Sequence, residues 1–249
     1  MENVPKLRDL KGKEKLTYFW DYYKWVVILI AVGIIVAITI IHAVVNKKEN
    51  ALYVLAVNAD PYVQEEVTET LFADFLQEQG IDPQKEEVLL NTGIQYLGGT
   101  STTDIYAMQS IVTIMGSGSA DVVMMPEDLY REQASLGAFV PVQYYLSSEE
   151  MEALGDRIIW VEKDRDLTTI AEEGEDDAPG TAYARGIRMD SGDKVGVSGL
   201  YGDTPPVIGI AGASEKPELA AALVRELLGL KEAGAERIKN TGQAIRAVI

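Results

Sequence analysis

One stretch of this chain is apolar at nearly every position. Val26 to Val45 reads VVILIAVGIIVAITIIHAVV and carries no charge unless His42 is protonated. As a helix, these twenty residues span about 30 Å, the thickness of one hydrocarbon core. The alternatives are a buried core helix, which seldom stays apolar on every face for so long, and a cleaved signal peptide, whose apolar region is usually about 7 to 15 residues long. We therefore predict a transmembrane helix at 26–45.

From residue 51 onward, short apolar runs alternate with amphipathic stretches. This pattern is typical of an α/β domain with a largely parallel sheet. We expect residues 51–249 to form one three-layer domain with a doubly wound sheet, after a linker at 46–50. The expected strands are 52–57 (LYVLAV), 87–91 (EVLLN), 121–125 (DVVMM) and 207–211 (VIGIA).

Capping residues and helix breakers mark the expected helices between these strands. The expected boundaries are an end at Gly80, a cap at 98–101 (GGTS), a start at Pro126, a cap at Ser147 and Ser148, and a long helix from about 216 to 230. The stretch 162–177 is highly charged and is expected to be a loop.

Charge divides the chain into a basic-leaning head and an acidic body. The net charge is −17, and residues 50–249 hold 14 basic and 34 acidic side chains. This acidic surplus repels phosphate backbones, so we expect no nucleic-acid partner. Six basic residues precede the apolar run and two follow it, and positive residues at a membrane end tend to remain cytoplasmic. We expect a single-pass protein of the cell membrane, with residues 1–25 inside the cell and the body outside.

Six aromatic side chains lie within the eight positions from Tyr18 to Trp25. Amphipathic rings concentrate at the headgroup level of a bilayer. We interpret this juxtamembrane segment as an interfacial belt that continues into the helix. An aromatic cluster that binds a cofactor or a partner is the alternative.

The chain has no Cys and a single His. These counts exclude a disulfide framework, a thiolate nucleophile, cysteine-ligated metal sites, a Ser-His-Asp arrangement and multi-histidine metal sites. We expect no catalytic residues, no metal site and no cofactor, and therefore no enzymatic activity.

Three segments of the body share patterns with one family of proteins. They are 106–142 (YAMQSIVTIMGSGSADVVMMPEDLYREQASLGAFVPV), 181–189 (TAYARGIRM) and 206–229 (PVIGIAGASEKPELAAALVRELLG). They resemble, in this order, the first lobe, a later strand, and a late strand and helix of type II extracellular solute-binding proteins of transporter systems, a bacterial periplasmic-binding-protein-like family. Ala184 and Arg185 stand where the second segment usually has small or apolar residues, and the charged Arg185 departs from that pattern. The resemblance implies the α/β fold of one lobe.

A second lobe is missing from this pattern. In the family, the strand that resembles 181–189 leads into a whole second lobe, but here fifteen residues separate Met189 from Pro205. Fifteen residues cannot build a lobe, and the family also continues beyond the last helix. The resemblance therefore implies a single lobe that does not close around a ligand.

Other candidate sites are weaker. Asp164, Asp166, Thr168 and Glu175 follow a calcium-loop spacing, but Thr169 replaces the required Gly. Ser191 and Lys194 match S-x-x-K in a Gly/Asp-rich loop, which we interpret as a turn.

Ligands of open α/β sheets bind outside the carboxyl ends of the strands. The side chains expected there, as candidate ligand-binding residues, are Asn58, Asp60, Thr92, Ser101, Glu127 and Asp128. Their acids favour a cationic or polyhydroxylated ligand. Helix caps and first-turn acids are the alternative roles.

The expected function is a non-enzymatic interaction or docking module at the cell envelope, held by one helix in the lipid bilayer. Its expected partner is an envelope or membrane protein. The alternative is a solute-binding or sensing component of a transport system, in which a small molecule is the ligand.

Overall fold

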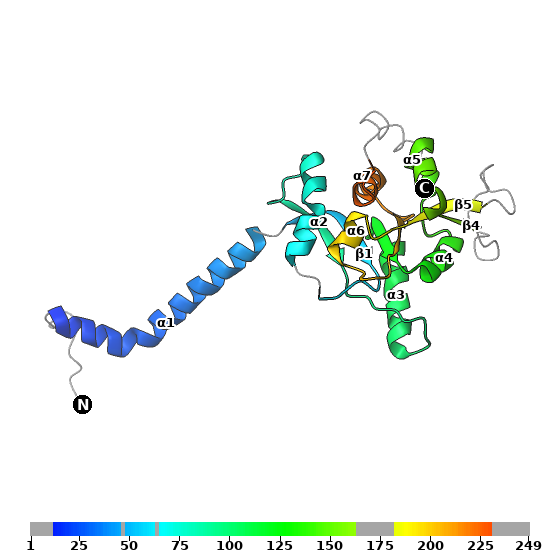
Figure 1. Ribbon diagram of the computed structural model, residues 1–249. Coiled ribbons are helices and arrows are strands. Elements are labelled where there is room, and N and C mark those ends of the chain that lie inside the picture. Colours follow the sequence, from blue (N-terminus) through cyan, green and yellow to red (C-terminus); the bar gives the residue numbers. More distant parts are fainter. Residues whose placement is uncertain (1–11, 46–47, 63–64, 163–181, 231–249) are drawn as a thin grey trace. The chain divides into compact units, whose positions relative to one another are not determined.

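The computed structural model describes residues 12–45, 48–62, 65–162 and 182–230. The chain divides into two units, Met1–Lys48 and Glu49–Ile249 (Figure 1). We call the second unit the body.

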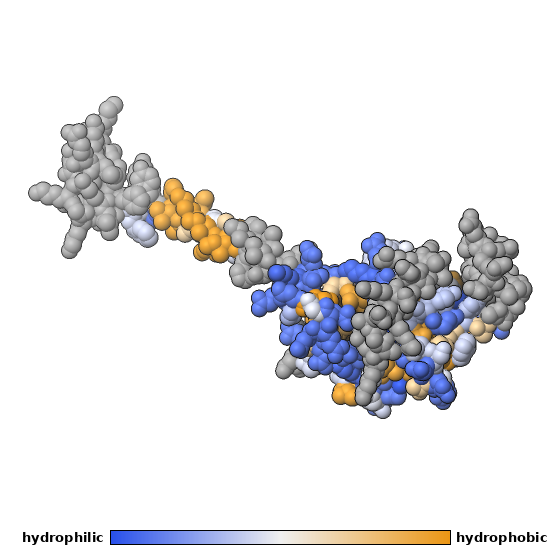
Figure 2. Space-filling view, turned by 90° about the horizontal axis from the view of Figure 1, so that it is seen from above, coloured by the Kyte–Doolittle hydropathy of each residue, from blue (hydrophilic) through white to orange (hydrophobic). Residues whose placement is uncertain are grey.

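The first unit contains the helix α1, Gly12–Val45, 34 residues long. Within α1, the structure describes the side chains of Trp20 and of residues 24–39. Most of the residues at 24–39 are hydrophobic (Figure 2). Three successive residues, Ile28, Leu29 and Ile30, are all exposed, although successive residues lie about 100° apart around a helix. Among the described residues, no helix is long and apolar enough to cross a membrane.

The body is built on a six-stranded sheet with the order β2-β1-β3-β6-β5-β4. The strands are β1 Glu49–Ala56, β2 Glu86–Asn91, β3 Val122–Met125, β4 Ile158–Glu162, β5 Ala182–Arg188 and β6 Val207–Ile210. The pairs β1–β2 and β1–β3 are parallel, whereas β3–β6, β6–β5 and β5–β4 are antiparallel.

This sheet confirms the α/β class and the four strands expected near 52–57, 87–91, 121–125 and 207–211. The expectation of a largely parallel sheet was wrong, because β6 runs against β3. An apolar run such as VIGI indicates burial but not strand direction. The expected cap at Ser101 and the cap at Ser147 are both present, each with a side chain that accepts a backbone N–H.

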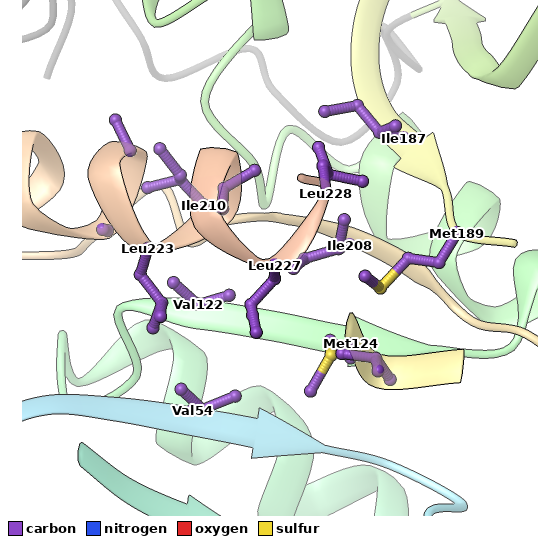
Figure 3. Close-up of a cluster of buried hydrophobic side chains, with 14 of the residues drawn as sticks. Val54, Val122, Met124, Ile187, Met189, Ile208, Ile210, Leu223, Leu227 and Leu228 are labelled. Carbon is purple, nitrogen blue, oxygen red and sulfur yellow. The ribbon is translucent and has the colours of Figure 1, made fainter. Parts of the chain in front are cut away.

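Helices cover both faces of the sheet and make it three-layered. The helices are α2 Glu65–Glu78, α3 Thr102–Gly116, α4 Glu127–Ser135, α5 Ser148–Leu154, α6 Lys194–Ser198 and α7 Pro217–Leu227, with short 3-10 helices η2 Val142–Tyr144 and η3 Gly155–Arg157. Residues of α2, α5, α6 and α7 join one buried apolar cluster, and residues of α3 and α4 join the other. In the first cluster, Leu223 and Leu227 of α7 lie over Val122 of β3 (Figure 3).

The helix α7 packs closely because apolar residues recur on its inner face. Ala220, Leu223, Val224 and Leu227 are all fully buried, and burying one such leucine is worth about 1.5–3 kcal/mol. Arg225 is buried as well, and its Nε donates to Glu150 Oε1 at 3.0 Å while its Nη2 donates to the Tyr145 carbonyl. This pair joins α7 to α5.

On the opposite face, two glycines let a tyrosine lie flat against the sheet. Tyr130 of α4 is fully buried, its hydroxyl donates to the Arg185 carbonyl at 2.9 Å, and its ring stacks on Phe139 with centroids 4.0 Å apart. A Cβ at Gly209 would lie 1.9 Å from the Tyr130 hydroxyl oxygen, and one at Gly186 would lie 2.5 Å from its ring. Both positions therefore require glycine.

Candidate functional site

The candidate site is the edge of the sheet where β1, β2 and β3 end. These strands are parallel, so their carboxyl ends meet at one edge, which we call the carboxyl edge. Because β6 and β4 are antiparallel to their neighbours, both start there, and β5 ends there. The six predicted residues all lie in or beside the connections of this edge. Within the described residues, no hydrogen bond or ion pair joins any two of them.

Asn58 holds two connections together. Its backbone is in the left-handed region at φ 61°, a conformation that asparagine tolerates better than most residues. Its Nδ2 donates to the Tyr96 carbonyl at 2.7 Å, and its Oδ1 accepts the Tyr96 N–H at 2.6 Å. Both the nitrogen and the oxygen of the Asn58 amide therefore bond to the backbone of Tyr96.

Asp60 and Thr92 shape turns. Asp60 Oδ1 accepts the Tyr62 N–H at 2.8 Å, and the Asp60 N–H donates to the Leu200 carbonyl at 2.8 Å. The Thr92 carbonyl accepts from Gln95 Nε2 at 3.3 Å, and the same nitrogen donates to the Ala59 carbonyl at 2.7 Å. The carboxylate of Asp60 is exposed and forms no ion pair with another described residue.

Ser101 caps α3 rather than facing a cavity. Its hydroxyl accepts the Asp104 N–H at 3.1 Å and donates to Asp104 Oδ2 at 2.5 Å. Asp104 Oδ1 accepts the Leu97 N–H at 2.9 Å. These hydrogen bonds from Ser101 and Leu97 hold the pKa of Asp104 below its usual value.

Glu127 is held by two arginines. Arg131 Nη2 lies 2.7 Å from Glu127 Oε1, and Arg188 Nη2 lies 2.7 Å from Oε2. Burial works to raise the pKa of Glu127, but the hydrogen bonds from Arg188 and Arg131 outweigh it and lower that pKa. Asp128, the next residue, is exposed.

A second ion-pair group lies beside Arg188. Arg157, just before β4, donates through Nε to the Arg188 carbonyl at 2.9 Å. Its Nη1 lies 3.1 Å from Asp190 Oδ2, and its Nη2 pairs with Asp193. Sequence reasoning missed these arginines, because nothing local to Arg157 marks partners more than thirty residues away.

The connection between β5 and β6 covers this edge. Lys194 Nζ donates to Asp74 at 2.8 Å and pairs with Glu226, which fastens α6 to α2 and α7. Burial works to lower the pKa of Lys194, but its hydrogen bonds with Asp74 and Glu226 outweigh it and raise that pKa. Of the S-x-x-K match, Ser191 lies in a turn, as expected, whereas Lys194 is the first residue of α6. The Tyr201 hydroxyl donates to the Met124 carbonyl at 3.0 Å, at the end of β3.

Three large apolar side chains stand out at the same edge. Tyr62 and Leu97 are each 89% exposed and Val197 is 77% exposed, the highest values among the large apolar residues described in the body. We call these residues the apolar trio. They lie in neighbouring connections, since Asn58 bonds to Tyr96 and Asp60 bonds to Leu200. Sequence reasoning missed them, although an apolar residue among turn formers, as in Asp60-Pro61-Tyr62, was an available signal.

The described residues contain no group of three or more His, Cys, Asp or Glu side chains that could hold a metal ion. The calcium-loop match at Asp164 to Glu175 lies outside the described residues. Comparisons of this chain with protein-family models, with curated proteins and with solved structures gave no match.

Proposed function

We propose that this chain is a single-pass membrane protein whose extracellular body is a non-enzymatic docking module at the cell envelope. The membrane part is supported by the uncharged run Val26–Val45, which continues the helix α1 to its end. Exposed apolar side chains on successive positions of α1 match a helix that meets lipid on every side. The basic residues before the run favour a cytoplasmic N-terminus.

The docking role rests on one observation, the exposure of large apolar side chains at the carboxyl edge. Two of its candidate side chains are engaged by the body's own groups, Asn58 by Tyr96 and Glu127 by Arg131 and Arg188. The apolar trio nevertheless remains exposed there. Small ligands are bound in concave sites by convergent polar groups, whereas protein partners cover protruding apolar and aromatic side chains. This edge therefore suits a protein partner better than a small solute.

The proposal assigns no reaction to the body. The strongest match to a catalytic spacing is Ser191 with Lys194, and Lys194 is committed to ion pairs with Asp74 and Glu226. A raised pKa keeps this amine protonated near neutral pH, and a protonated amine cannot act as a base.

A solute-binding or sensing component remains the second candidate. It is supported by the resemblance to type II solute-binding proteins in residues 106–142 and 206–229. The short connection between Met189 and Pro205 weakens it, because capture between two lobes needs a second lobe and fifteen residues cannot build one.

The test compares two triple variants in the native cell. Tyr62→Ser, Leu97→Ser and Val197→Ser remove the apolar trio, and Leu89→Ser, Leu136→Ser and Trp160→Ser remove three other exposed apolar side chains as a matched control. We expect an amine-reactive crosslinker to join the native chain to a defined membrane or envelope protein. This product should disappear in the first variant and persist in the second. Equal crosslinking in both would contradict docking through the carboxyl edge.

A further inference from the structure

The surface around the apolar trio is acidic. Among the described residues, the carboxyl edge has four cations, and all are paired with carboxylates of the body: Arg131, Arg157, Arg188 and Lys194. Three exposed acids of the same edge, Asp60, Asp128 and Asp203, form no ion pair with another described residue. The edge thus combines apolar side chains with uncompensated negative charge, and it attracts a positively charged apolar segment.

The described part of the chain ends at this edge. Near the start of α7, Lys216 Nζ donates to the Asn50 and Ala51 carbonyls at 2.8 Å, at the beginning of β1. Near its end, Glu226 pairs with Lys194 of α6, at the carboxyl edge. Figure 3 shows α7 passing from Leu223 to Leu228 in the same direction as the β1 strand that carries Val54. The last described residue, Leu230, therefore lies toward the carboxyl edge, on the side of α6.

The sequence that follows has the complementary chemistry. Residues 231–249 contain four basic side chains (Lys231, Arg237, Lys239 and Arg246) and two acidic ones, whereas residues 49–230 contain 10 basic and 33 acidic side chains. The segment also carries Ile238, Ile245, Val248 and Ile249. Its nineteen residues reach up to about 60 Å when extended, more than the roughly 25 Å across a six-stranded edge.

We propose that residues 231–249 bind the carboxyl edge of their own molecule, with basic side chains against the exposed acids and apolar side chains over the apolar trio. The contact requires only the body and does not rest on the proposed docking function. Where a docking partner exists, the segment competes with that partner for the same surface.

The absence of Cys allows a direct test on the purified full chain in detergent, without any partner. Leu97→Cys with Ile245→Cys places one thiol at the edge and one in the segment. Gln84→Cys with Ile245→Cys is the matched control, because Gln84 is exposed in the turn before β2, at the opposite edge. Under mild oxidation we expect the first pair to form an intramolecular disulfide at least ~10-fold faster than the control. Equal rates, or disulfides mainly between two molecules, would overturn the proposal.

A second measurement covers the case in which a thiol perturbs the contact. The full chain with Arg237→Glu, Lys239→Glu and Arg246→Glu keeps all its apolar residues but loses the positive charge of the segment. We expect faster hydrogen exchange at residues 60–62 and 92–101 than in the native chain. Unchanged exchange would also overturn the proposal. The docking function is judged separately, because it fails if the envelope crosslink described above is absent or is equal in both triple variants.

Discussion

Two nitrogens of Arg188, the last residue of β5, contact the same carboxylate oxygen of Glu127 at the start of α4. Arg188 Nε donates to Glu127 Oε2 at 2.8 Å, and Arg188 Nη2 lies 2.7 Å from that oxygen. The contact ties the antiparallel half of the sheet to a helix of the parallel half, at the carboxyl edge. Both side chains are partly exposed, so solvent screens the pair. Its effect on the free energy of unfolding is therefore modest and depends on pH.

Glu127→Gln is expected to lower the free energy of unfolding by about 0.5–1 kcal/mol at neutral pH. The folded-state pKa of Glu127 lies below the unfolded one, so the stabilisation is fully present above the unfolded pKa and is lost as the pH falls through the folded pKa. Urea denaturation of the two proteins should differ at pH 7 and converge well below the ordinary glutamate pKa of about 4.3. If the difference in the free energy of unfolding stayed constant down to low pH, the contacts of Glu127 with the arginines would not be the cause of that difference.

Arg225→Met should be far more damaging. It leaves Glu150 buried without its cation and the Tyr145 carbonyl without a donor, and breaking a buried pair costs about 3–5 kcal/mol. The matched control is Lys85→Met, since Lys85 pairs with Asp82 at 3.5 Å and is 80% exposed. We expect the control to change the free energy of unfolding by less than about 0.5 kcal/mol in the same denaturation experiment. Similar losses in both variants would contradict the role of the Arg225 pair.

Gly209→Ala is expected to destabilise the body by about 1–3 kcal/mol or to prevent folding, because the new methyl group collides with the Tyr130 hydroxyl. Gly116→Ala makes the same chemical change at the end of α3, where no atom lies within 4 Å of the new Cβ. Thermal unfolding should show a lower Tm for the first variant and no loss for the second. A normal Tm for Gly209→Ala would mean that Tyr130 does not lie against β6.

Helix caps and buried strands of the body could be predicted from the sequence, because the residues that indicate them are close together in the chain. Ser101 precedes an apolar helix and caps it, and runs such as VVMM at 122–125 predict buried strands. The six candidate residues were placed at the carboxyl edge because parallel strands bring their ends together.

The remaining features depend on partners that are distant in sequence. Arg188 lies 61 positions from Glu127, and Tyr96 lies 38 positions from Asn58, so neither contact has a local signature. The strand β4 (IIWVE) was not predicted, because a five-residue run next to a charged stretch carries little periodic signal. The antiparallel direction of β6 was missed because an apolar run indicates burial but not strand direction.

The proposed orientation, with the N-terminus in the cytoplasm, predicts an asymmetric result with protease. A protease added to intact cells should digest the body and leave an N-terminal stub that ends near residue 48. An epitope tag added at the N-terminus should remain on this stub in intact cells. The protease should remove the tag only when the cells are permeabilised. Protection of the C-terminal region in intact cells would reverse the orientation, and a mature chain that begins near Asn46 would indicate a cleaved signal peptide instead.

The central claim is that the carboxyl edge docks a protein and does not enclose a small solute. Isothermal titration calorimetry of the purified body, residues 49–249, against sugars, peptides, polyamines and amino acids tests it most directly. One sheet offers a single half-exposed wall, so we predict no binding tighter than the millimolar range, about 4 kcal/mol. A submicromolar affinity for any of these solutes would contradict the claim and favour a solute receptor.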